Sequence, residues 1–149
     1  MFSKFTGRYD HTIDSKGRLT IPANYRPLLP DSQAFITQGF DTNLMVMTTE
    51  AFESFSQQLT ETSLTDPDAR QLLRLIFSST QEVNIDGAGR ILIPQFLREV
   101  ARIESAVVVI GMGSMFELWS PEAWVSQDAL LQDASFKHKG YSGFTIKVV

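Results

Sequence analysis

Lys16, Gly17 and Arg18 place two cations around a glycine in the stretch TIDSKGRLTIP. A guanidinium can donate two parallel hydrogen bonds to a phosphate or a guanine edge, whereas an ammonium acts as a point charge on a phosphate. Glycine permits the positive φ of a tight turn and lets the backbone amide approach an anion. The stretch therefore indicates a turn that contacts DNA. The alternative is a turn in which Asp14 and Arg18 simply pair with each other.

Further basic side chains precede this turn in the sequence. Residues 1–30 hold five Lys and Arg residues against two Asp, a net charge of +5 − 2 = +3, although the whole chain carries −4. The basic character is therefore local to the first turn. Side chains on the preceding strand could contact phosphates, which sets the register on a duplex without reading its sequence. The candidate DNA-binding residues are Lys4, Arg8, His11, Lys16, Gly17 and Arg18.

The same stretch returns later as NIDGAGRILIP, which indicates a duplication. Sliding the chain by 72 residues aligns residues 12–52 with 84–124 and gives eleven identities in 41 columns. The second copy keeps the aspartate, the glycine and the arginine but replaces the Ser–Lys pair by Gly–Ala. What both copies retain is expected to hold the turn, so a DNA contact by the second arginine stays open. The predicted structural residues of the turns are Asp14, Asp86, Gly89 and Arg90.

Each repeat predicts the same order of elements. A strand leads into the tight turn, and a second strand ends at Pro22 or Pro94, because proline cannot donate to a sheet ladder. A short helical segment, a β-hairpin and a capped helix follow. Arg26 and Arg98, at matching positions, are expected to form surface or inter-repeat ion pairs. The predicted division is repeat 1 over 8–55, a helical linker over 56–83, repeat 2 over 84–127, and a helix end with a basic tail over 128–149.

Composition limits the function classes. The 149 residues are 43% hydrophobic, enough for a packed core, and include no cysteine and only two histidines. Thiolate chemistry is excluded, and neither a metal site nor a cofactor is expected. No Walker loop, G-x-S-x-G elbow or dinucleotide fingerprint is present, so an enzyme is not expected. No apolar run could span a membrane and no signal peptide is evident, so a cytoplasmic location is expected.

The paired stretches DSKGRLTIP and DGAGRILIP, with the MF start, His11 before the first turn and FELW after the second, resemble the MraZ family of the SpoVT/AbrB-like superfamily. The resemblance covers about residues 1–130. It implies a mainly β protein with short helices (α+β). It also implies a pseudo-twofold, swapped-hairpin β-barrel of the double-psi-like AbrB type, formed by the two internal repeats.

The resemblance further implies a sequence-specific, nucleoid-associated transcriptional regulator whose first motif contacts DNA. It would bind double-stranded DNA at direct repeats in the promoter of the division and cell-wall gene cluster, including its own gene. A ring-shaped homo-oligomer of more than two subunits is expected. Apolar residues of the linker helix and at the hairpin ends, around Phe40, Met112 and Met115, could supply the subunit contacts. The alternative function is an antitoxin-like protein-binding module without direct DNA readout.

Overall fold

The computed structural model describes residues 4–144 and 146 of the chain. The strands are β1 (Arg8–Thr12), β2 (Arg18–Thr20), β3 (Gln33–Gln38), β4 (Asn43–Met47), β5 (Gln81–Asn84), β6 (Arg90–Leu92), β7 (Ala106–Gly111) and β8 (Met115–Trp119). The α-helices are α1 (Thr49–Thr60), α2 (Pro67–Ser79), α3 (Gln95–Val100), α4 (Pro121–Leu131) and α5 (Ala134–Ser142). Two 3₁₀ segments, Ala23–Leu28 and Pro30–Ser32, lie between β2 and β3.

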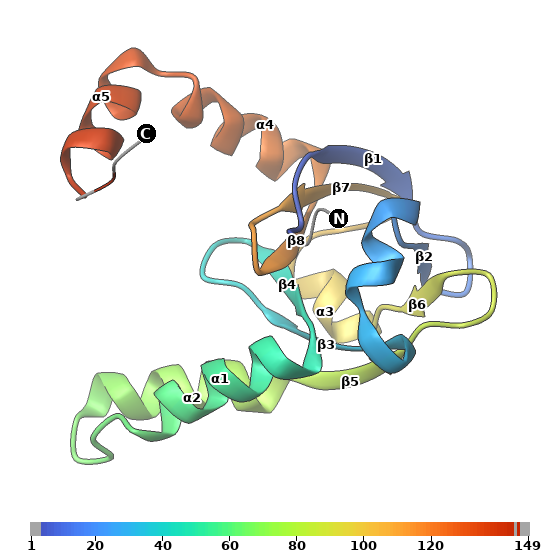
Figure 1. Cartoon of the computed structure of the whole chain (residues 1–149), viewed down its shortest axis with the longest axis horizontal. Coiled ribbons are helices and arrows are strands. Elements are labelled where there is room, and N and C mark those ends of the chain that lie inside the picture. Colours follow the sequence, from blue (N-terminus) through green and yellow to red (C-terminus); the bar gives the residue numbers. More distant parts are fainter. Residues whose placement is uncertain (1–3, 145, 147–149) are drawn as a thin grey trace.

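The two repeats are intertwined through their strand pairing. The large sheet has the order β1-β7-β8-β4-β3-β5, and β2 pairs with β6 in a separate two-stranded ribbon, all antiparallel. The first strand of each repeat therefore pairs with the hairpin of the other: β1 with β7, and β5 with β3. The order reads the same when the repeats are exchanged, which gives the fold a pseudo-twofold axis. Figure 1 shows the ribbon at one end of the molecule and two helical arms, α1–α2 and α4–α5, at the other.

The mainly antiparallel α+β class predicted from the sequence is confirmed, but the closed barrel is wrong. Over the described residues, β1 and β5 are the two edges of the large sheet, and the β2–β6 ribbon does not join them into one ladder. Strand β2 is linked to the residues just after β1 by the isolated bridge between Ile13 and Leu19 and by the 2.9 Å bond from the Asp14 N–H to the Arg18 carbonyl. The physical reason is strand length. Pro22 and Pro94 follow three-residue strands almost immediately, so these strands are too short to close the sheet.

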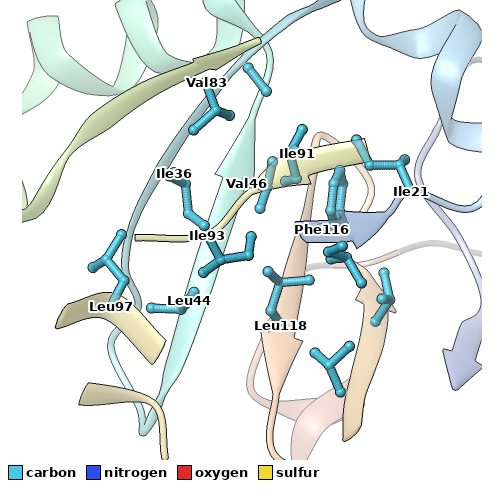
Figure 2. Packing of buried hydrophobic residues seen from close by; sticks show 14 of the residues in the cluster. Ile21, Ile36, Leu44, Val46, Val83, Ile91, Ile93, Leu97, Phe116 and Leu118 are labelled. Atoms are coloured by element: carbon cyan, nitrogen blue, oxygen red, sulfur yellow. The ribbon is translucent and has the colours of Figure 1, made fainter. Parts of the chain in front are cut away.

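One hydrophobic core is shared by both repeats. The inner face of the large sheet packs against the inner face of the ribbon, and Figure 2 shows Ile21, Ile91 and Ile93 meeting Phe116 and Leu118. The sequence predicts that the apolar residues next to both turns are buried in one shared core. Ile13, Leu19, Ile21, Ile91 and Ile93 are at most 5% exposed, and Ile85 is partly buried against the same cluster.

The repeats correspond with a one-residue register change that the ungapped alignment conceals. Leu44 and Phe116 are 116 − 44 = 72 positions apart and both face the core. In β3 and β7, however, buried Ala34 corresponds to buried Val107, 107 − 34 = 73 positions later, whereas Ala106 is exposed. A slip of one residue moves a side chain to the opposite face of a sheet. The hairpin turn of the second repeat is one residue shorter and restores the register.

Helices cover the outer face of the large sheet. The predicted hydroxyl caps are present: Thr48 and Ser120 accept hydrogen bonds from the backbone N–H groups three residues later. Helix α2 docks through fully buried Ile76 and through a 3.0 Å contact between the hydroxyls of Thr37 and Ser79. Helix α5 lies where the sequence predicts only a basic tail; part of that predicted segment falls outside the described residues. None of the described helices is long and apolar enough to cross a membrane.

Candidate nucleic-acid interface

The first turn, residues 14–18, is organised by a single carboxylate. Oδ1 of Asp14 accepts hydrogen bonds of 2.9 Å from the backbone N–H groups of Lys16 and Arg18, and its Oδ2 accepts a 2.8 Å bond from Arg18 Nε. Gly17 has a φ of +82°, a backbone conformation that residues with a side chain rarely adopt. The turn therefore presents Lys16 outward and holds the Arg18 guanidinium by one edge. The two terminal nitrogens of Arg18 make no hydrogen bond within the described residues.

The second turn, residues 86–90, has the same geometry. Asp86 accepts bonds from the backbone N–H groups of Ala88 and Arg90 at 3.0 and 2.9 Å, and from Arg90 Nε at 2.9 Å. Gly89 has a φ of +78°. Both aspartates thus brace their turns mainly through the backbone. The turns differ at two positions: Gly87 stands in place of Ser15, and Ala88 stands in place of Lys16, so the second turn has no counterpart of the lysine charge.

Hydrogen bonding lowers the pKa of both turn carboxylates. For Asp14 the backbone N–H of Arg18 is the largest cause, with the Arg18 side chain and the Lys16 amide adding to it against a desolvation effect that raises the pKa. For Asp86 the corresponding N–H of Arg90 is the largest cause. Both carboxylates are therefore charged at neutral pH, and each neutralises part of the charge of its arginine partner.

The ribbon brings the two arginines onto one surface. Arg18 pairs in register with Leu92, and Thr20 pairs with Arg90. Leu19 and Ile91 between them point into the core and are at most 1% exposed, so the alternate residues form the outer face. Each turn also bonds to the other repeat: Ile93 N–H donates to the Gly17 carbonyl at 2.8 Å, and Ile21 N–H donates to the Gly89 carbonyl at 2.9 Å. Because β2 and β6 run antiparallel, the two turns lie at opposite ends of the ribbon, each beside the last residues of the other repeat's strand. Figure 1 shows the ribbon and both turns on the side of the molecule away from the helical arms. We call β2, β6 and both turns the turn ribbon.

Two further arginines, Arg26 of the first 3₁₀ segment and Arg98 of α3, reach the turn ribbon, and the sequence-based expectation of ion pairs for them is wrong. A Cβ at Gly17 would lie 3.0 Å from Nη2 of Arg98, and a Cβ at Gly89 would collide with the guanidinium of Arg26. Each arginine thus crosses to the glycine of the other repeat. Neither forms an ion pair within the described residues, and Arg98 Nε donates to the Ile93 carbonyl at 3.0 Å. In the sequence, the two arginines stand at matching positions, four residues after each proline, and this match was the signal that could have indicated their shared role.

Two of the other candidate residues lie apart from the turns. Arg8 pairs with Asp128 of α4 at 3.0 Å and lies 5.0 Å from the ring centroid of Trp124. The bonds from Gln132 and then from Arg8 lower the pKa of Asp128. Lys4 lines a hollow at the start of α1 together with Glu50. His11, on β1, is half-buried near Tyr9 and is the nearest of the three to the first turn in the chain.

The described residues do not form a metal site. Among residues 4–144 and 146, no cluster of three or more His, Asp or Glu side chains is arranged to hold a metal ion. The fold and the paired turns thus define a two-repeat α+β protein whose repeats build one cationic ribbon together.

Comparison with known proteins gives the family. The model of the MraZ protein family, described as antitoxin-like, matches residues 4–75 and again residues 76–145. The chain belongs to the MraZ family, as the sequence resemblance predicts. The two matches agree with the duplication seen in the sequence.

Several relatives with the same name align with this chain over most of their length. A protein of Roseiflexus castenholzii is 42% identical over 120 residues, 80% of this chain and 83% of that protein. A protein of Thermomicrobium roseum is 39% identical over 127 residues, 85% and 89% of the two chains. A protein of Dictyoglomus thermophilum is 42% identical over 120 residues, 80% and 82%. Each is named transcriptional regulator MraZ, so these relatives are regulators rather than enzymes.

Proposed function

We propose that this chain is a sequence-specific transcriptional regulator that binds double-stranded DNA through the turn ribbon. The observation that carries the proposal is the convergence of Lys16, Arg18 and Arg98 on the first turn, from two different repeats. A two-stranded ribbon fits the major groove of B-DNA. The relatives named as transcriptional regulators support the same function.

The residues of the first turn have distinct proposed roles. The free terminal nitrogens of Arg18 can grip a guanine edge bidentately. Lys16 and Arg98 neutralise phosphates. Gly17, predicted from the sequence as a contact, is left out of this proposal because it is buried next to the Arg98 guanidinium and its N–H already donates to the Asp14 carbonyl at 2.9 Å. His11 adds a phosphate contact. Arg8 and Lys4, predicted from the sequence as contacts, become secondary in this proposal because they contact α4 and line the α1 hollow.

Assembly complements this small contact surface. One subunit offers few cations, and salt weakens each phosphate contact. We propose a ring of more than two subunits that places successive ribbons on direct repeats in the promoter of the division and cell-wall gene cluster, including the protein's own gene. Linked contacts gain from a high effective concentration. The protein would act in the cytoplasm at the nucleoid.

The strand pairing also supports a proposal on how the two repeats arose. The exchange of first strands between the repeats is the pairing expected of a swapped-hairpin arrangement. We propose that the repeats extend over 8–55 and 84–127 and descend from a unit that once paired between two chains.

The deciding experiment is a binding titration. DNA from upstream of the protein's own gene and a scrambled duplex of equal length are titrated at two salt concentrations. Preference for the upstream DNA with a steep loss at high salt is expected. No binding at low salt would refute the proposal.

The second candidate function is an antitoxin-like protein-binding module, which the description of the matching family model favours. It predicts a stoichiometric protein partner that copurifies with the chain. It also predicts that upstream DNA is not protected from nuclease digestion by the purified complex.

A further inference from the structure

Helix α5 carries apolar and basic side chains that its own subunit leaves uncovered. Phe136 is 46% exposed, and Phe144, just after the helix, is 71% exposed. Lys137, His138 and Lys139 lie in the same helix, which contains no acidic residue. The α2 helix of the first repeat, by contrast, buries Ile76 completely against the sheet. The second repeat thus ends in a helix without a docking site on its own sheet.

The other helical arm holds a hollow of matching character. The hollow has a volume of about 310 Å³ and lies between α1 and the two hairpin ends. Its apolar lining consists of Phe40, Met45, Met47, Ala51, Phe55 and Met115. An apolar cavity of about 150 Å³ accommodates benzene, so this hollow has room for a phenylalanyl ring. Methionine side chains adapt to such an insertion.

Charge complements this apolar match. Helix α1 contains Glu50 and Glu53, both exposed, and no lysine or arginine, and Glu61 follows it directly. The residues from 31 to 80 carry two arginines against seven carboxylates, +2 − 7 = −5. Opposite charges steer two surfaces into one register and disfavour alternatives. Glu50 and Glu53 line the adjoining hollow at the start of α1, together with Lys4, and the two hollows share Ala51 and Ser54. The basic α5 helix is therefore suited to the acidic surface of α1 beside the apolar hollow.

The two surfaces belong to separate arms of one subunit. Helix α5 follows α4 after only Gln132 and Asp133, and Figure 1 shows the α4–α5 arm projecting away from the α1–α2 arm. We propose that α5 of a second copy of this chain docks on α1, with Phe136 inserted into the hollow and Lys137 and Lys139 beside Glu50 and Glu53. This inference deepens the proposed ring and rests on it. Because the two faces differ, the contact is head-to-tail, and repeated head-to-tail contacts close into a ring when the rotation permits.

Two complementary variants test this contact without DNA. Phe136→Ala removes the inserted ring, and Phe40→Asp places a charge at the rim of the hollow, where Phe40 is 62% exposed. Analytical ultracentrifugation should show wild-type assemblies larger than a dimer and each variant alone as a monomer. A mixture of the two variants should form a one-to-one dimer, because one intact tail still meets one intact hollow. Lys137→Glu combined with Lys139→Glu should weaken assembly more than about tenfold.

Phe96→Ala is the matched control, since Phe96 is 40% exposed on α3 and loses the same ring. It should assemble like the wild type, and circular dichroism should show every variant folded. Monomeric wild type, full assembly of Phe136→Ala, or a mixture that remains monomeric would each overturn the contact. Capture of a different protein by a monomeric chain would assign the hollow to that partner instead. DNA binding is measured separately, so its failure would refute the proposed function without changing these sedimentation results.

Discussion

Arg18 and Arg90 lie on the same outer face of the turn ribbon, Arg18 opposite Leu92 and Arg90 opposite Thr20. The two arginines come from different repeats, yet their ion pairs with aspartate are 2.8 and 2.9 Å long. The sequence predicts a DNA contact for Arg18 and a structural role for Arg90. The local geometry is shared, and Arg26 lies beside the second turn as Arg98 lies beside the first. The predicted difference between the two arginines therefore rests on Lys16, which Ala88 replaces in the second turn.

Arg18→Ala should weaken operator binding by about 1–3 kcal/mol per engaged subunit if Arg18 grips a base. Its melting temperature should change little, because Asp14 keeps both backbone N–H bonds. Arg90→Ala should weaken binding less, because its turn lacks the lysine. Its stability cost should also be small, since the Asp86 side chain is 39% exposed and keeps its backbone bonds.

The measurement pairs a binding titration with a melting curve for each variant. Leu92→Ala alters the same outer face without removing a charge and serves as the comparison. If Arg18→Ala and Arg90→Ala lose equal affinity while both remain folded, the assignment of DNA reading to the first turn is wrong.

Arg98→Ala should reduce the salt dependence of DNA binding. Each lost phosphate contact lowers the slope of log K against log salt by about 1. The same reduction is expected for Lys16→Ala, and both variants should lose affinity for specific and scrambled DNA about equally. Arg70→Ala provides the control, because Arg70 lies on α2 and donates to the Leu64 carbonyl. An unchanged slope in Arg98→Ala would remove this residue from the contact surface.

Cutting the chain after Leu64 should leave neither fragment folded. Strands β1 and β3 would lose their partners β7 and β5, which lie on the other side of the cut. The core would be divided as well, because residues of both repeats form one cluster. Circular dichroism of the separate fragments and of their mixture measures this. Two fragments that melt cooperatively on their own would contradict the shared core.

The sequence predicts those parts of the molecule that depend on local pattern. The D-x-x-G-R spacing and the alternating apolar residues identify both turns and the buried isoleucines, because each depends on neighbouring residues. The register change in β7 is not visible, since the alanines and glycines that align without a gap conceal it. Nor is the crossing of Arg26 and Arg98, which depends on how one repeat packs on the other. The open sheet, by contrast, follows from the three-residue strands before Pro22 and Pro94, and the barrel was expected only from the family resemblance.

Acid should weaken the fold partly through the two turn carboxylates. Hydrogen bonding in the folded state lowers the pKa of Asp14 and Asp86 below the ordinary value near 3.8. A lowered folded-state pKa adds stability above the unfolded pKa, and this stability is lost as the pH falls below about 4 through the folded pKa. The double variant Asp14→Asn with Asp86→Asn should therefore melt below the wild type at pH 7. The two melting temperatures should converge between about pH 4 and pH 2. Thr20→Ala, which removes no titratable group from the ribbon, should show a difference from wild type that does not vary with pH. A double variant whose melting temperature stays equally far below wild type at pH 7 and at about pH 2 would show that these carboxylates brace the turns no better when charged.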